Sequence, residues 1–177
     1  MKYTWILLAV LCLTALFLVS CHSAKNPADP SDTGLPPADF APEDLVRFSY
    51  SHSGSMADQC YTFSLWVEDG IYWFSMEELF SGGSVLQTPI EEQTLLEVGR
   101  IVAEYRMDLW DGFEESSSLL LDGDGFSVEM EFADGHTVSA RGYGCTPDGY
   151  GPAMDSILEM YLELLTKYDE LAITETE

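Results

Sequence analysis

The side chains that most often carry out catalysis are scarce in this sequence. His52 and His136 are the two histidines beyond the N-terminal region, and His52 lies in the run Ser-His-Ser-Gly-Ser at positions 51–55. A histidine could activate a neighbouring serine as a nucleophile, but such a site is defined by spatial geometry and not by adjacency in the chain. No Gly-x-Ser-x-Gly, His-Glu-x-x-His or phosphate-binding glycine motif is present. We therefore interpret both histidines as surface residues and favour a protein that is not an enzyme.

Carboxylates, by contrast, are abundant, with 31 Asp and Glu residues in the chain. Two of them facing each other across a cleft would suit glycoside hydrolysis, but that depends on their spatial separation. Asp and Gly alternate at positions 122–125, and such an acidic, flexible loop is a weak candidate for calcium. In an EF-hand register, Phe126 falls on the fifth position and Ser127 on the sixth, which requires glycine. We therefore expect a turn there, with Asp122 and Asp124 as weak metal candidates and no cofactor.

Aromatic side chains are the strongest candidates for contact with a ligand. Tyr72, Trp73 and Phe74 are consecutive, so a strand here must direct rings to both faces of its sheet. Rings that stay exposed would form a stacking platform for a glycan or a protein. The alternative is that the second face packs beneath the loop around Trp110. The candidate ligand-binding residues are Trp66, Trp73, Trp110, Tyr143 and Tyr150.

Two cysteines, Cys60 and Cys145, lie in the body of the chain. In an exported protein such a pair suggests a disulfide, which limits the unfolded ensemble. The alternative is two thiols, as in envelopes that make few disulfides. Because there is no Cys-x-x-Cys pair, the sequence indicates neither a zinc knuckle nor a thioredoxin-like redox site.

The N-terminal residues carry a targeting pattern. Lys2 precedes an uncharged apolar run at 5–19, which has the length of a signal-peptide core and is short for a membrane span of roughly 20 residues. The run ends in Leu-Val-Ser-Cys at Cys21, which looks like a lipobox. Cleavage before Cys21 would leave its thiol joined to a diacylglyceryl group, and several acyl chains anchor firmly. We predict a signal peptide at 1–20 and a bacterial lipoprotein held on a membrane, outside the cytoplasm. The alternative is an uncleaved anchor.

Composition separates a tether from a single folded body. Five of the eight prolines fall within 22–42, so we assign 21–42 to the lipidated cysteine and a flexible, extended tether. The remaining 43–177 is one domain of ordinary size. The chain has a net charge of −24, which should repel nucleic acid and anionic lipid surfaces, while its 46% hydrophobic content is too high for a disordered acidic chain.

Hydrophobic periodicity predicts an α+β body. Alternating residues indicate strands at 46–52, 60–68 and 71–76, with 81–86 as a weaker strand or a loop. Asp69-Gly70 has the type I′ hairpin signature, and Asp134-Gly135 turns a second hairpin that starts near Phe126.

Two helices are predicted between and after these hairpins. The first opens at Thr88-Pro89 with a capping box completed by Glu91, and it buries Leu95, Val98, Val102 and Tyr105, with Arg100 and Arg106 toward its end. The second runs over about 152–168. The order ββ(β)αββα predicts an antiparallel sheet built from hairpins, with two helices packed on one face.

The stretch from Trp110 to Gly151 holds a series of short aromatic and glycine motifs. Their residues are Trp110, Gly112, Phe113, Leu121, Asp122, Gly123, Phe126, Asp134, Gly135, Ala140, Gly142, Pro147 and Tyr150. This series resembles the pattern W-x-G-F, L-D-G-x-x-F, a D-G hairpin, A-x-G-x-N and P-x-x-Y of a family of uncharacterised secreted lipoproteins from gut Firmicutes and their relatives. Gly144 replaces the family's asparagine. The resemblance implies a shared domain and a shared cellular location, and no particular activity.

Taken together, these features favour a membrane-anchored binding or interaction module. A hydrolase with a carboxylate-based site and a structural envelope protein are the alternatives.

Overall fold

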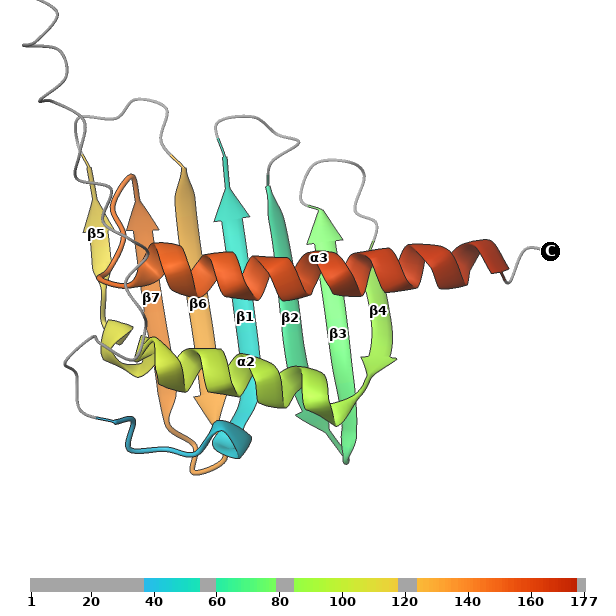
Figure 1. Ribbon diagram of the computed structural model, residues 1–177. Coiled ribbons are helices and arrows are strands. Elements are labelled where there is room, and N and C mark those ends of the chain that lie inside the picture. Colours follow the sequence, from blue (N-terminus) through green and yellow to red (C-terminus); the bar gives the residue numbers. More distant parts are fainter. Residues whose placement is uncertain (1–36, 55–59, 79–84, 118–123, 175–177) are drawn as a thin grey trace, which may run out of the picture. The chain divides into compact units, whose positions relative to one another are not determined.

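A computed structural model describes residues 37–54, 60–78, 85–117 and 124–174 (Figure 1). Contacts divide the chain into two units, Met1–Gly34 and Leu35–Glu177, and the second is described here. Cys21 and the signal segment lie outside the described residues, as do Ser55 and Asp122. Among the described residues, no helix combines the length and the apolar character that a membrane span requires.

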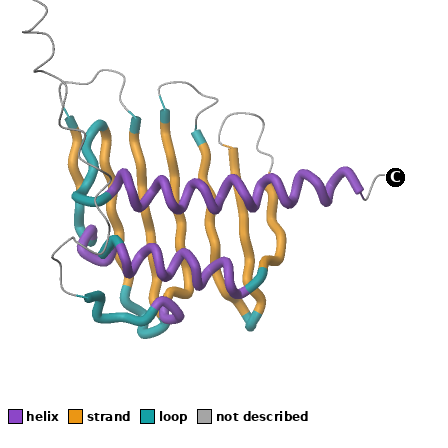
Figure 2. The backbone as a smooth tube through the Cα atoms, in the orientation of Figure 1, coloured by secondary structure: helices purple, strands orange, loops and turns teal. Residues whose placement is uncertain are grey.

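The fold is a mostly antiparallel sheet covered on one face by two helices, which confirms the predicted α+β class. The strands are β1 (Leu45–Ser53), β2 (Tyr61–Glu68), β3 (Ile71–Glu78), β4 (Val85–Ile90), β5 (Glu114–Ser116), β6 (Gly125–Phe132) and β7 (Thr137–Tyr143). Their order in the sheet is β4-β3-β2-β1-β6-β7-β5, and only the β5–β7 pair is parallel within the described residues. The helices α2 (Glu92–Glu104) and α3 (Tyr150–Thr174) run across the strands on the same side (Figure 2).

Both predicted hairpin turns are present, and each has the backbone conformation that its residues favour. Asp69 and Gly70 have φ values of 52° and 76°, the positive pair that a type I′ turn needs between β2 and β3. Between β6 and β7 only Gly135 is left-handed, with φ 86°. There the amide of Phe132 donates to the carbonyl of His136, which makes a three-residue loop with glycine at its left-handed position.

The predicted start of the first helix is wrong. Thr88 and Pro89 belong to strand β4, and α2 begins at Glu92 after Glu91, which makes no side-chain cap. Because β4 is an edge strand, the missing amide of Pro89 is tolerated opposite Trp73. The predicted weak strand at 81–86 therefore lies several residues too early, and 79–84 fall outside the described residues.

The two helices bury apolar stripes against the sheet, largely as predicted. Helix α2 buries Leu95, Val98 and Val102, whereas Tyr105 is half-buried at its C-cap. Helix α3 starts at Tyr150, earlier than predicted, and buries Tyr161, whose ring stacks on a core phenylalanine. The core comprises Leu45, Phe48, Tyr50, Phe63, Leu65, Phe74, Leu95, Val98, Ile101, Val102, Met107, Trp110, Phe126, Val128, Met130, Phe132, Val138, Ala140, Ala153, Met154, Ile157, Tyr161 and Leu164.

The chain packs onto this body before residue 43, although we assigned 21–42 to the tether. The ring of Phe40 lies 4.7 Å from that of Phe132. A short 3-10 helix, η2 (Pro42–Asp44), then crosses α2 at Gly99, which has no side chain to obstruct it. The N-terminal side of β1 is therefore held against α2.

Arg106 lies just beyond α2 and holds this approach in place. Its φ is 53°, a left-handed conformation that is uncommon for residues with a side chain. The guanidinium donates to both carboxylate oxygens of Asp108 at 2.8 Å and to the carbonyl of Pro37 at 3.3 Å. The second 3-10 helix, η4 (Met107–Trp110), follows directly.

Candidate functional site

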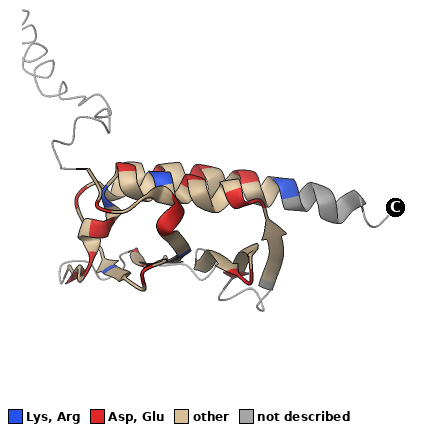
Figure 3. Cartoon of the chain, turned by 90° about the horizontal axis from the view of Figure 1, so that it is seen from below, with Lys and Arg blue, Asp and Glu red and all other residues tan. Residues whose placement is uncertain are grey.

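Three of the predicted ligand-binding residues, Trp66, Trp73 and Tyr143, lie on the face of the sheet opposite the helices. Within the described residues, no other element lies over this face (Figure 3). Small hydroxyl side chains cover its middle: Ser49 Oγ and Ser64 Oγ are 2.8 Å apart, and so are Ser51 Oγ and Thr62 Oγ1. The face is therefore polar across the central strands.

Two tryptophans interrupt this polar surface. Trp66 and Trp73 are directly opposite each other in β2 and β3, with ring centroids 6.4 Å apart and planes inclined at 22°. Arg47 lies on the β1 side of the pair, its guanidinium carbon 5.6 Å from the centroid of Trp66, and Pro89 lies on the β4 side. Because both rings are only partly buried, they provide an accessible aromatic strip. We call Arg47, Trp66, Trp73 and Pro89 the tryptophan row.

Two ion pairs lie on this face. Arg47 lies 3.9 Å from Glu131, and Arg141 lies 3.4 Å from Glu129. All four side chains are about half exposed, so each ion pair contributes little to stability, roughly 0–1 kcal/mol. Strand alternation also places the exposed carboxylate of Glu68 on this face, two residues along β2 from Trp66, so the surroundings of the tryptophan row include a further negative charge.

Trp110 does not join this row. Its side chain is 3% exposed, and its indole N–H donates to the carbonyl of Asp148 at 3.0 Å. The ring lies on the helix side of the sheet, 5.8 Å from the ring of Tyr150. The loop around Trp110 therefore does not cover the second face of the sheet, which was the alternative to an exposed platform.

Several of the residues that carry the family resemblance pack together near Trp110. The ring of Phe126 lies 6.3 Å from Phe113 and 4.4 Å from Tyr150. A side chain on Gly142 would overlap the ring of Phe126 and the carbonyl oxygen of Cys145. These residues hold one corner of the domain together, whereas Asp134 and Gly135 form the turn at the other end of β6. Its residues 121–123 lie outside the described part of the chain.

Tyr150 instead borders a cavity of about 560 Å³ on the helix side, between β1, β6 and α3. Its hydroxyl lies 3.0 Å from that of Tyr50, which is also 3.4 Å from Nδ1 of His52. Burial, the Tyr150 hydroxyl and the charge of Asp124 raise the pKa of Tyr50, so its phenol stays protonated. Burial likewise raises the pKa of Tyr150.

His52 is half-buried in this cavity rather than on the open surface that we expected, whereas His136 is exposed. Strand alternation directs Ser51 to the opposite face of the sheet, where it bonds to Thr62. The neighbouring serine and histidine therefore do not form a nucleophile–base pair.

The cysteines and Tyr143 take separate places. Cys60 is buried, and its thiol donates to the carbonyl of Gly54 at 3.7 Å. Cys145 is half-buried in the cavity wall, and no bond joins the two sulfurs in the structure. The predicted disulfide stays a prediction. Tyr143 is half-buried at the end of β7, on the platform side of the sheet.

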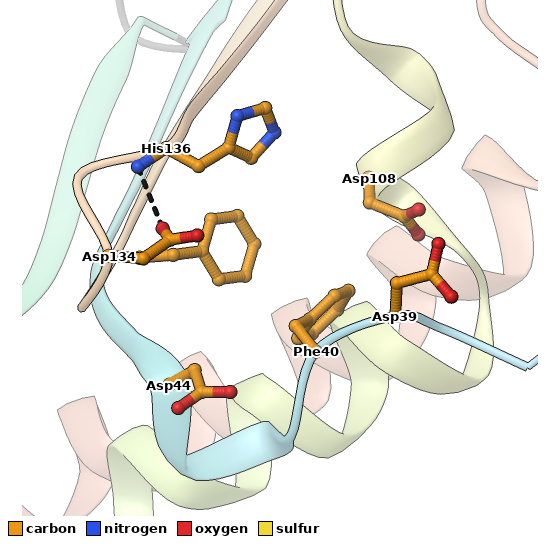
Figure 4. Close-up of a pocket in the computed structure, with 7 residues that line it drawn as sticks. Asp39, Phe40, Asp44, Asp108, Asp134 and His136 are labelled. Carbon is orange, nitrogen blue, oxygen red and sulfur yellow. Dashed lines mark hydrogen bonds between the residues drawn. The ribbon is translucent and has the colours of Figure 1, made fainter.

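Carboxylates surround a second pocket, of about 330 Å³, at the other end of β6. It is lined by Asp39, Phe40, Asp44, Asp108, Phe132, Asp134 and His136 (Figure 4). Three of the acids already hold local structure: Asp134 accepts the backbone amide of His136, Asp44 that of Ala41, and Asp108 pairs with Arg106. Among the described residues, no three His, Cys, Asp or Glu side chains are arranged to hold a metal ion.

The fold defines an α+β protein in which two helices cover one face of a sheet and leave the other open. No protein-family model matches the chain, and no curated protein matches it.

Proposed function

We propose that this protein is a lipoprotein anchored to a bacterial membrane through Cys21, and that its body is a binding module for a carbohydrate outside the cytoplasm. One observation carries the binding role: Trp66 and Trp73 lie side by side on a sheet face over which no described element packs. The lipobox and the resemblance to secreted lipoproteins support the proposed location, on a membrane and outside the cytoplasm.

The chemistry of the face suits a neutral sugar. Sugar rings present C–H faces that pack on indole rings, and hydroxyls that hydrogen-bond to a polar surrounding. The tryptophan row supplies indole rings for the C–H faces of a sugar. The hydroxyls around Ser49 and Ser51 supply hydrogen-bond partners for its hydroxyl groups. An acidic sugar is disfavoured, because the chain carries a net charge of −24.

The proposal is tested by the affinity of the full-length chain, in a mild detergent without sugar, for a panel of neutral envelope and host glycans. Trp66→Ala and Trp73→Ala should each weaken binding by about 30-fold, the loss typical of a central aromatic contact. Leu162→Ala is the matched control, because this residue is 59% exposed on α3, on the other side of the sheet. Unchanged binding in both tryptophan variants, or no glycan bound by the native chain, would refute the platform and favour a structural envelope role.

The anchor is tested separately by Cys21→Ser. This change removes the thiol that would take the diacylglyceryl group. The native chain should begin at Cys21 and carry the mass of the lipid, whereas the variant should carry no lipid and keep residues 1–20. A native chain that begins at residue 1 without the lipid mass, and is unchanged in mass by Cys21→Ser apart from the substitution, would support an uncleaved N-terminal anchor instead.

A second candidate function is hydrolysis at the acidic pocket. Figure 4 places Asp39 and Asp108 across the pocket from Asp134 and His136. Hydrolysis of a bound glycan that is abolished by Asp39→Asn would favour this function. The structural contacts of Asp108 and Asp134 make binding the better supported of the two.

A further inference from the structure

The cavity beside Tyr150 lies apart from the tryptophan row. It lies on the helix side of the sheet, and its volume of about 560 Å³ falls within the range of small-molecule pockets, roughly 300–1,000 Å³. β1, the start of β6, the loop after β7 and the first turns of α3 form its walls. It does not depend on the proposed carbohydrate binding.

Aromatic rings line the inner part of this cavity. Tyr50, Phe126, Tyr150 and His52 all border it, and the centroids of Phe126 and Tyr150 are 4.4 Å apart. The negative faces of such rings attract a cation placed over them. Met154, which is 3% exposed, adds an apolar and polarisable contact.

The charged groups at the cavity are all negative. Asp124 and Asp155 are both exposed at its rim, and no lysine or arginine is among its described lining residues. Asp124 lies close enough to the inner wall to act on it, because its charge adds a small contribution, behind burial and the neighbouring tyrosines, to the raised pKa of both Tyr50 and Tyr150. An anion would be repelled here, and a cation attracted.

The inner polar groups already satisfy one another. The hydroxyls of Tyr50 and Tyr150 are bonded, and no described buried side-chain nitrogen or oxygen lacks a partner. A ligand therefore does not need to bring N–H donors into the cavity. A positive charge inside an apolar shell fits these walls better than a strongly hydrated ammonium or a metal ion.

We propose that this cavity binds a small quaternary ammonium ion, held by the faces of Tyr50, Phe126 and Tyr150 and by the charges of Asp124 and Asp155 at the rim.

The probe is choline, titrated calorimetrically into the full-length chain in an uncharged detergent. Its neutral control is 3,3-dimethylbutan-1-ol, which has the same shape with carbon in place of the charged nitrogen. Choline should bind, and the neutral compound should bind at least about tenfold more weakly. Equal affinity for the two compounds, or no heat from millimolar choline, would overturn the proposal.

The contribution of the rim is tested by the double variant Asp124→Asn, Asp155→Asn. It should weaken choline binding at least about tenfold, whereas Asp148→Asn, an exposed acid of the neighbouring loop outside the cavity, should not. If the double variant fails to fold, the single variant Asp155→Asn, at an exposed position of α3, provides the same comparison. Unchanged affinity in the folded variant would refute the role of these carboxylates.

Discussion

Gly99 provides the sharpest test of how the N-terminal segment packs on the body. It lies in the middle of α2, where η2 crosses the helix. A Cβ atom at this position would overlap the carbonyl oxygen of Pro42 and lie 2.9 Å from its carbonyl carbon. Both atoms are backbone, so they cannot rotate away as a flexible side chain would. Gly99→Ala must therefore displace either η2 or the helix.

Two effects of opposite sign determine the stability of this variant. Alanine is favoured over glycine inside a helix by roughly 0.5–1 kcal/mol. Overpacking a close contact costs about 1–3 kcal/mol. We expect the steric cost to exceed the helix preference, with a net loss of about 1–2 kcal/mol in the free energy of unfolding. At an open helical glycine the first effect acts alone.

Gly151 in the first turn of α3 supplies that control, because nothing lies within 4 Å of a Cβ built there. Urea unfolding of the full-length chain, followed by circular dichroism, should show Gly151→Ala to be neutral or stabilised by up to about 1 kcal/mol. Gly99→Ala should lower the free energy of unfolding. It should also speed hydrogen exchange at the amide of Asp44, which donates to the carbonyl of Ala41 at 2.9 Å. A stabilised Gly99→Ala with a protected Asp44 amide would refute the packing.

Three further predictions concern titration, the core and a turn. The pKa of Tyr61 is raised to about 12 by burial and by the nearby Tyr50, whereas the unfolded chain releases this proton near 10. The stability that Tyr61 contributes is therefore complete below pH 10 and is lost as the pH rises to about 12. Over this range the urea midpoint of Tyr61→Phe should fall less than that of the parent protein, because phenylalanine has no proton to release. Tyr161→Ala removes a ring whose centroid lies 4.5 Å from that of Phe63, and it should lower the free energy of unfolding by about 3–5 kcal/mol. Its neighbour Leu162 is exposed, so Leu162→Ala should stay within about 0.5 kcal/mol of the parent in the same urea titration. Gly70→Ala forces a side chain into φ 76° and should cost about 1–2 kcal/mol in that assay; an unchanged midpoint would contradict the turn conformation.

Local sequence patterns were sufficient to predict five of the seven described strands, the hairpin turns and the buried helix faces, whereas β5 was not predicted and β4 was placed too early. Alternation in β1, β2 and β6 depends on nearest neighbours along the chain. The turn at Asp69-Gly70 depends on the backbone freedom of two residues. The stripe of Leu95, Val98 and Val102 follows from the helical repeat. These features are encoded within a few residues of one another, so they can be read without knowledge of the fold.

The start of α2 could not be predicted in this way, because two local signals competed. Thr88-Pro89 has the composition of a helix start, but the same residues complete an edge strand beside β3. The sheet provides a paired position that the local pattern does not reveal. Tertiary pairing therefore overrode the capping signal and delayed the helix to Glu92.

The candidate sites depended most on the tertiary structure. From the sequence, Trp66, Trp73, Trp110 and Tyr150 were one group of aromatic candidates. The sheet order places β1 between β2 and β6, and strand alternation then directs the first two rings to the open face. Trp110 and Tyr150 pack on the helix side, beside a cavity that β1 and β6 build from distant parts of the chain. The sequence alone determined which residues are aromatic and which alternate along a strand. Non-local strand pairing decided which of these residues share a surface, because a sheet joins segments that no local pattern connects.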